Sequence, residues 1–200
     1  VILIFLQLIV FPFNSEIENC VHVKYSTDRE NYYAGENIYL NFQINIDEGF
    51  YIYSVNPEKS LSPTYIEVLD SVHFSQIGIM HEPIPLIKFD KNLNQNISYH
   101  QSSIELVQDL KLSEDMLPGV YEVEFTLIYL ACDPKMCIPK WDDFSFNLNV
   151  DQGQARQEYV GNIKLEYDSG FVFRERLLAI NTYDRKKSLF KRFNLSNGSN

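Results

Sequence analysis

Cysteine, glycine and proline are scarce in this sequence: its 200 residues include three cysteines, eight glycines and eight prolines. So few cysteines exclude a miniature fold held together by several disulfides, and so little glycine and proline excludes a collagen-like chain. Hydrophobic residues make up 45% of the chain and aromatic residues 14%, which excludes a wholly disordered protein. We therefore expect one domain with a well-buried core.

Positive charge is also in short supply. Acidic residues outnumber basic ones by 27 to 17, for a net charge of −10. A nucleic-acid-binding protein needs a basic surface to displace counterions, so we expect no nucleic-acid partner. The net charge is −13 over residues 1–150 and +3 over residues 151–200. This change of sign predicts a domain boundary near Asp151.

No apolar run is long enough to span a membrane as a helix. Residues 1–13 are almost entirely apolar, but a helix needs about 20 such residues to cross a bilayer. The run has the length of a signal-peptide core, and polar residues follow at once. We interpret residues 1–15 as the remainder of a signal peptide and expect a periplasmic or otherwise exported protein, with its thiols in an oxidising compartment. A buried strand or a core helix is the alternative.

Apolar and polar residues alternate along much of the chain between Val21 and Val150, as in half-buried strands. The predicted strands are 21–25, 38–46, 50–53, 64–69, 98–110, 119–131 and 144–150. We therefore predict an all-β fold over residues 21–150, an immunoglobulin-like antiparallel β-sandwich that folds without the rest of the chain.

The sequence leaves the fold of residues 151–200 open. Residues 162–167 could form a strand, and residues 171–193 mix apolar with basic side chains. One interpretation is a basic amphipathic helix that contacts an anionic membrane. The other is a poorly ordered tail, or part of a second segment.

Two alternating runs are joined by the four residues between Cys132 and Cys137, where Asp133 and Pro134 favour a type I turn. Cross-strand Cβ atoms lie ~4.5–5.5 Å apart and a disulfide needs ~3.5–4.5 Å, so the two cysteines can form one. Closing so small a loop stabilises the fold by only about 2 kcal/mol. The sequence is therefore consistent with either an exchangeable or a structural disulfide.

The stretch from Tyr129 to Pro139 resembles a signature of the N-terminal domain of the thiol:disulfide interchange protein DsbD, the disulfide bond corrector domain family. In that signature a Tyr-x-x-Cys run precedes a second Cys with a proline beside it. Residues 49–57 resemble the family's aromatic strand, and residues 78–83 with Asp90 resemble its approach to a cap loop. In order, these segments cover roughly residues 21–150.

The resemblance implies an immunoglobulin-like domain that passes reducing equivalents from a membrane electron donor to partner proteins. Such partners are disulfide isomerases and cytochrome-maturation proteins, and no cofactor is implied. By motif position, Cys137 would attack a substrate disulfide and Cys132 would be the resolving thiol. Tyr51 and Tyr53 would shield the pair, although as alternate residues of one strand they could simply face the core.

His81 and Glu82 would lie where the chain approaches the cap loop. The sequence departs from the family here, because no aromatic residue follows Glu82 directly. Ile84, Leu86 or Phe89 would have to serve as the lid.

Other interpretations concern the same region. The main rival to exchange is a non-catalytic binding module whose disulfide is permanent. A zinc site that combines Cys20 and His22 with the hairpin cysteines lacks standard ligand spacing, so we expect no metal. We expect His73 and His100 at the surface.

Charged residues of both signs lie near the cysteine pair in the sequence, and the sequence does not determine their net effect on the pKa of the thiols. Acidic groups raise the pKa of a thiol and basic groups lower it. The residues concerned are Asp133, Asp142 and Asp143 on the one side and Lys135 and Lys140 on the other.

Overall fold

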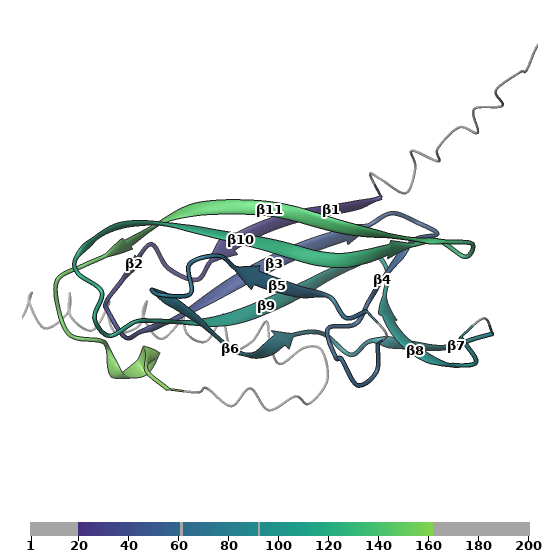
Figure 1. Ribbon diagram of the computed structural model, residues 1–200, viewed down its shortest axis with the longest axis horizontal. Helices are drawn as coiled ribbons and strands as arrows, with labels where there is room; N and C mark the ends of the chain where they lie inside the picture. Colours follow the sequence, from purple (N-terminus) through teal and green to yellow (C-terminus); the bar gives the residue numbers. More distant parts are fainter. Residues whose placement is uncertain (1–19, 61, 92, 162–200) are drawn as a thin grey trace, which may run out of the picture. The chain divides into compact units, whose positions relative to one another are not determined.

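Two β-sheets packed face to face form the part of the chain that the computed structural model describes, residues 20–60, 62–91 and 93–161 (Figure 1). The predicted all-β antiparallel sandwich is confirmed. The interpretations of residues 1–15 as a signal peptide and of residues 162–200 as a strand, membrane helix or tail lie outside the described residues.

The first sheet has the strand order β1-β3-β9-β6, with every neighbouring pair antiparallel. Its strands are β1 (Val21–Thr27), β3 (Asn37–Ile46), β6 (Phe74–His81) and β9 (Ser103–Leu112). In β3, Phe42, Ile44 and Ile46 are buried and alternate with polar Gln43 and Asn45. This period of two directs one side of the strand into the core.

The second sheet has the order β2-β11-β10-β4-β8-β7, and β5 also pairs with β10. Its strands are β2 (Asn31–Tyr32), β4 (Tyr51–Tyr53), β5 (Tyr65–Val68), β7 (Leu86–Asp90), β8 (Gln95–His100), β10 (Gly119–Cys132) and β11 (Cys137–Val150). The β2–β11 pair is parallel. β10 and β11 form one long hairpin, whose register ends at the pair Cys132 and Cys137.

Aromatic rings from both sheets meet in the core between them. Phe42 of β3 lies edge-on to Phe125 of β10, with ring centroids 5.6 Å apart. Tyr25 of β1 makes a second edge contact with Phe125, at 5.4 Å. Full burial of a ring such as Phe42 or Phe125 contributes roughly 1.5–3 kcal/mol, so these contacts help to hold the two sheets together.

Five strands of the structure, β2, β6, β7, β8 and β9, were not predicted as such. The predicted strand 98–110 is wrong as one unit: β8 belongs to the second sheet and β9 to the first, and Ser102 between them has a positive φ of 65°. β2, β6 and β7 were not predicted. In β6 the alternation is broken by Gly78, also at φ 65°, and by a register shift between Ile77 and His81.

The packed unit extends beyond the predicted end of the sandwich. β11 ends at Val150, but the compact unit runs to Gly161. Arg156 forms an ion pair of 2.7 Å with Glu36, whose side chain is fully buried. Tyr159, in the short 3-10 helix η1 (Gln157–Tyr159), is buried as well. Residues 151–161 are thus part of this unit.

Candidate functional site

A disulfide joins Cys132, the last residue of β10, to Cys137, the first residue of β11. The predicted four-residue turn between them is confirmed. The Asp133 carboxylate accepts hydrogen bonds from the backbone N–H groups of Lys135, at 2.6 Å, and Met136, at 2.8 Å. The Asp133 N–H donates to the Met136 carbonyl at 2.9 Å. The aspartate side chain therefore replaces missing backbone partners and holds the turn closed.

The two cysteines differ sharply in exposure. Cys132 has no exposed surface, whereas Cys137 is exposed. Met136, beside Cys137 in the turn, is 45% exposed, and the hairpin tip projects from the sandwich (Figure 1). A second protein can therefore approach Cys137 but not Cys132.

A small aromatic cluster surrounds the buried cysteine. Tyr51 of β4 lies directly opposite Cys132 in the register of β4 and β10. Tyr51, Tyr53, Ile97 and Cys132 form a buried cluster separate from the main core, with Tyr99 packed against it. The Tyr51 ring makes edge contacts with Tyr53, at 6.1 Å, and with Tyr99, at 5.4 Å. Tyr51 and Tyr53 do face a core, and that core contains Cys132.

Lys88 of β7 covers this cluster. Its Nζ lies 3.5 Å from the centroid of the Tyr51 ring and 4.8 Å from that of Tyr99. Burial lowers the pKa of Lys88, and nearby Asp90 partly opposes this. Burial, with smaller contributions from Tyr53 and the two carboxylates Asp90 and Asp133, raises the pKa of Tyr51 to about 12. The cluster therefore brings a lysine side chain against the ring of Tyr51, whose pKa burial raises.

Glu82, placed by the sequence at the approach to the cap loop, connects β4 and β8. Its carboxylate accepts hydrogen bonds from Ser54 Oγ, at 2.6 Å, and from the Val55 N–H, at 2.9 Å, and it pairs with His100 Nε2 at 2.7 Å. Burial alone would raise the pKa of Glu82, but these hydrogen bonds outweigh it and the pKa is lowered. The residue therefore holds the strand ends that carry Tyr53 and Tyr99.

The two neighbouring histidines also lie in this region. His81, at the end of β6, lies 3.3 Å from the carboxylate of Asp109. His100 is only 3% exposed, so the prediction that it lies at the surface is wrong. No local pattern distinguishes a buried histidine of this kind, because its partner Glu82 comes from another strand end.

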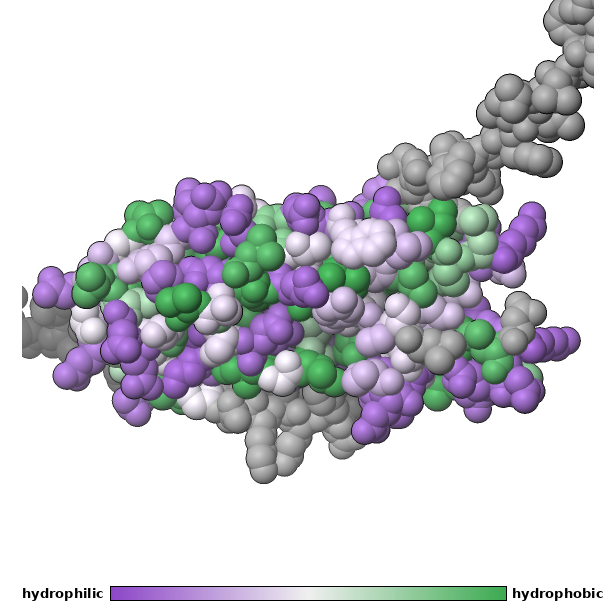
Figure 2. All heavy atoms as spheres, in the orientation of Figure 1, coloured by the Kyte–Doolittle hydropathy of each residue, from purple (hydrophilic) through white to green (hydrophobic). Residues whose placement is uncertain are grey.

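The three candidate lid residues lie at the surface. Ile84, Leu86 and Phe89 are 70%, 44% and 58% exposed. They belong to the segment that leads into and forms β7, and Figure 2 shows hydrophobic residues among hydrophilic ones on this part of the surface. Lys88, which no motif indicated, lies over Tyr51 instead.

Of the three acidic residues considered near the disulfide, Asp133 alone is in the turn. Asp142 accepts a hydrogen bond of 2.7 Å from the Tyr129 hydroxyl, and Asp143 accepts one of 2.7 Å from Thr126. Both are on β11, five and six residues beyond Cys137, or ~17–20 Å along an extended strand. Their charges are therefore remote from the sulfur atoms.

The third cysteine lies outside the disulfide. Cys20 is buried, and burial raises the pKa of its thiol. Within the described part of the chain, no three or more histidine, cysteine and acidic side chains are grouped so as to hold a metal ion. His22 lies 3.3 Å from Asp47.

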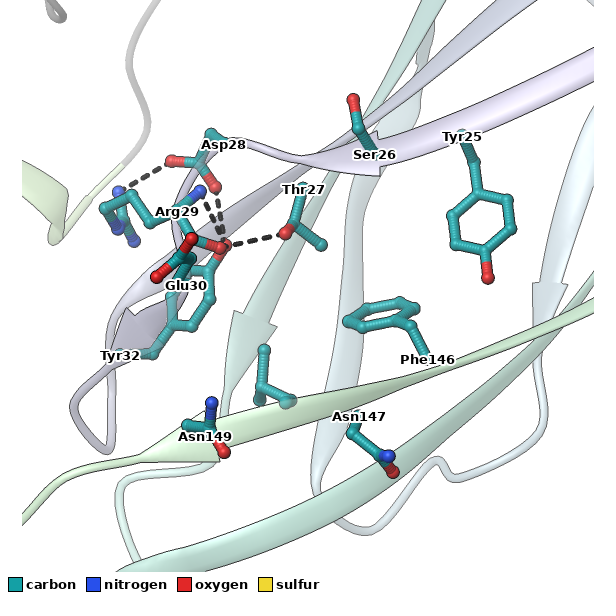
Figure 3. Close-up of a pocket in the computed structure, with 11 residues that line it drawn as sticks. Tyr25, Ser26, Thr27, Asp28, Arg29, Glu30, Tyr32, Phe146, Asn147 and Asn149 are labelled. Atoms are coloured by element: carbon teal, nitrogen blue, oxygen red, sulfur yellow. Dashed lines mark hydrogen bonds and ion pairs between the residues drawn. The ribbon is translucent and has the colours of Figure 1, made fainter.

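An open hollow of about 520 Å³ lies between β1, the segment after it, and β11 (Figure 3). Its polar groups bond one another: Arg29 pairs with Asp28 at 2.7 Å, and the Tyr32 hydroxyl donates to Asp28 at 2.9 Å. Phe146 and Asn147 line it from β11. The polar groups of the hollow thus already have partners within the protein, and we assign the hollow no ligand.

No protein-family model and no curated protein matches the chain. Among solved structures, the reduced N-terminal domain of DsbD from Neisseria meningitidis is 13% identical, over 73% of this chain and 96% of that one, with a TM-score of 0.43. The N-terminal periplasmic domain of ScsB from Proteus mirabilis is 15% identical, over 66% of this chain and 47% of that one, with a TM-score of 0.45. The former belongs to the family that the sequence motifs resemble, but similarity at this level transfers no function.

No helix in residues 20–60, 62–91 or 93–161 is long and apolar enough to cross a membrane.

Proposed function

We propose that this domain exchanges its Cys132–Cys137 disulfide with the thiols and disulfides of partner proteins. The observation that carries the proposal is the unequal exposure of the two cysteines at a projecting hairpin tip. An attacking thiol must reach a partner sulfur, and a resolving thiol must stay beside it while being protected from other reagents. Cys137 meets the first condition and Cys132 the second.

The exchange proceeds in two balanced steps from the reduced pair. The Cys137 thiolate attacks one sulfur of a partner disulfide, forming a mixed disulfide and releasing the other partner sulfur as a thiolate, which takes up a proton. The Cys132 thiolate then attacks Cys137, forming the internal disulfide and releasing the second partner thiolate. The partner disulfide gains two electrons, and the pair in this domain loses two.

The aromatic cluster supports this assignment. Tyr51 and Tyr53 share a buried cluster with Cys132, which supports a role for them in shielding the resolving thiol. Glu82 fixes the strand ends that carry the rings, and we assign it and His81 a structural role at the approach to β7.

Partners and location belong to the same proposal. The apolar run at residues 1–13 and the disulfide itself support an exported domain that works in an oxidising compartment. There the pair would receive electrons from a membrane donor and pass them to proteins of the isomerase or cytochrome-maturation type. The basic tail's contact with a membrane stays a prediction.

Trapping the mixed disulfide tests the function. In Cys132→Ser the exposed Cys137 should form an adduct with a disulfide-bearing protein that persists on a non-reducing gel, because the resolving thiol is gone. Cys137→Ser should form no adduct and reduce nothing. Cys20→Ser serves as the matched control and should behave as the wild type does.

Two results would contradict the proposal in different ways. An adduct that forms only with Cys137→Ser would reverse the two roles. No adduct with either variant would favour the rival function, a binding module with a permanent disulfide. The exposed apolar residues Ile84, Leu86 and Phe89 would then be the candidate recognition surface.

A further inference from the structure

Lys88 holds a positive charge against the aromatic cover of the buried cysteine. Its Nζ is 3.5 Å from the Tyr51 ring centroid, a distance at which a cation is attracted to the ring face. Tyr51 in turn lies opposite Cys132 across the β4–β10 pair. Lys88 and Cys132 therefore share one neighbour, although they lie on different hairpins of the sheet.

Cys132 is the member of the pair that needs such a charge. It has no exposed surface, and burial in apolar surroundings raises the pKa of a thiol. Only the thiolate attacks a disulfide, so burial that protects Cys132 also slows its reaction. Cys137 is exposed and has no comparable obstacle.

Charges of both signs surround the cluster. Asp90, two residues beyond Lys88 on β7, and Asp133 in the turn both act electrostatically on Tyr51, and both disfavour a thiolate. Lys88 is the cation that lies over both Tyr51 and Tyr99. The titratable groups on the elements that form the cluster include Tyr51, Tyr53, Asp90, Tyr99, His100 with its partner Glu82, Tyr129, Asp133, Lys135, Cys137 and Lys140.

We propose that Lys88 is a positioning residue for the second step of the exchange, in which its ammonium group favours the thiolate form of Cys132. This inference rests on the proposed function. In that step the Cys132 thiolate supplies the electron pair of the new Cys132–Cys137 bond. The bond from Cys137 to the partner sulfur breaks, and the partner leaves as a thiolate that takes a proton from water. Lys88 lowers the energy of the attacking anion and transfers no proton itself.

The test follows both steps in the full chain, with glutathione disulfide as the probe. The reduced protein is mixed with the probe and quenched with acid, and the species with one glutathione on Cys137 is counted by mass spectrometry. In Lys88→Met this adduct should form at the wild-type rate, because Cys137 is exposed. Its conversion to the internal disulfide should be about tenfold slower at neutral pH, with the pH profile moved up by about one unit.

Three further variants separate charge from packing. Lys88→Arg keeps the charge and should restore the wild-type pH profile. Lys91→Met removes an exposed lysine just beyond β7 and should leave both steps unchanged. Lys88→Gln removes the charge with a polar side chain and should match Lys88→Met.

The outcomes distinguish this inference from the function on which it rests. If Lys88→Met resolves the adduct with the rate and pH profile of Lys91→Met, the inference is overturned and the exchange function stands. If Lys88→Met is slow but Lys88→Gln is not, packing is responsible and the inference is again overturned. If the wild type forms no Cys137 adduct at all, the proposed function fails.

Discussion

Tyr51 lies directly opposite Cys132 across the β4–β10 pair, so the cover of the buried sulfur comes from a strand far away in the sequence. Tyr53 belongs to the same buried cluster. This arrangement gives the two hairpin cysteines different surroundings, and the predictions below depend on that difference.

Removing the aromatic cover should expose one cysteine and not the other. In the reduced Tyr51→Ala/Tyr53→Ala protein, we expect iodoacetamide to alkylate Cys132 roughly tenfold faster or more, because reaction would no longer wait for local opening. Cys137 should change little, since it is exposed already. Tyr65→Ala, which removes a 42% exposed ring on β5, is the control. An unchanged rate at Cys132 would remove the shielding role.

The reduction potential should mark the disulfide as exchangeable. The ring closed by Cys132 and Cys137 is small, so we expect a potential above roughly −300 mV, the value below which structural disulfides lie. Equilibration with defined thiol–disulfide buffers measures it, and Cys20→Ser ensures that the pair alone is titrated. A lower potential would favour the binding-module function.

Acid should weaken the fold partly through Glu82. The pKa of Glu82 is lowered in the folded protein from its ordinary value of 4.5, so the unfolded state takes up the proton first as the pH falls. The stabilisation is complete above that value and is lost as the pH falls through the lower, folded pKa. Glu82→Gln should be roughly 1.5–3 kcal/mol less stable at neutral pH and should lose less on acidification. Thermal unfolding at both pH values measures this.

An exposed carboxylate provides the comparison for Glu82. Glu67→Gln on β5 removes a charge that is exposed to solvent. It should leave stability at neutral pH and its acid dependence close to those of the wild type. If Glu82→Gln and the wild type lost the same stability on acidification, Glu82 would not be a source of the acid sensitivity.

A chain that ends at Val150 should be less stable than one that ends at Gly161. The sequence had instead predicted that residues 21–150 fold without the rest of the chain. Glu36 is fully buried and would lose Arg156, keeping Arg29 at 3.6 Å as its remaining cation. We expect a loss of about 1–3 kcal/mol relative to a chain ending at Gly161, or roughly 2–12 °C in the unfolding midpoint. Glu36→Gln should recover part of this loss in the shorter chain. Equal midpoints for the two chains would restore the boundary at Val150.

Local patterns in the sequence determined the fold class and the hairpin. Alternation identified β3, β10 and most of β1, because side chains on a strand point to opposite faces with a period of two. Asp133 and Pro134 indicated the turn, and a four-residue turn sets the register that brings Cys132 beside Cys137. These features depend on neighbours in the chain, so the sequence contains them directly.

The tertiary structure decided which groups surround that disulfide. Tyr51 was named from a motif, but its place opposite Cys132 depends on the pairing of β4 with β10. Lys88 and the Arg156–Glu36 pair had no signal in the sequence, and the latter joins residues 120 positions apart. Such contacts arise only when strands from distant segments take their places in a sheet, because burial rewards the assembled sandwich and no local stretch of chain specifies its neighbours.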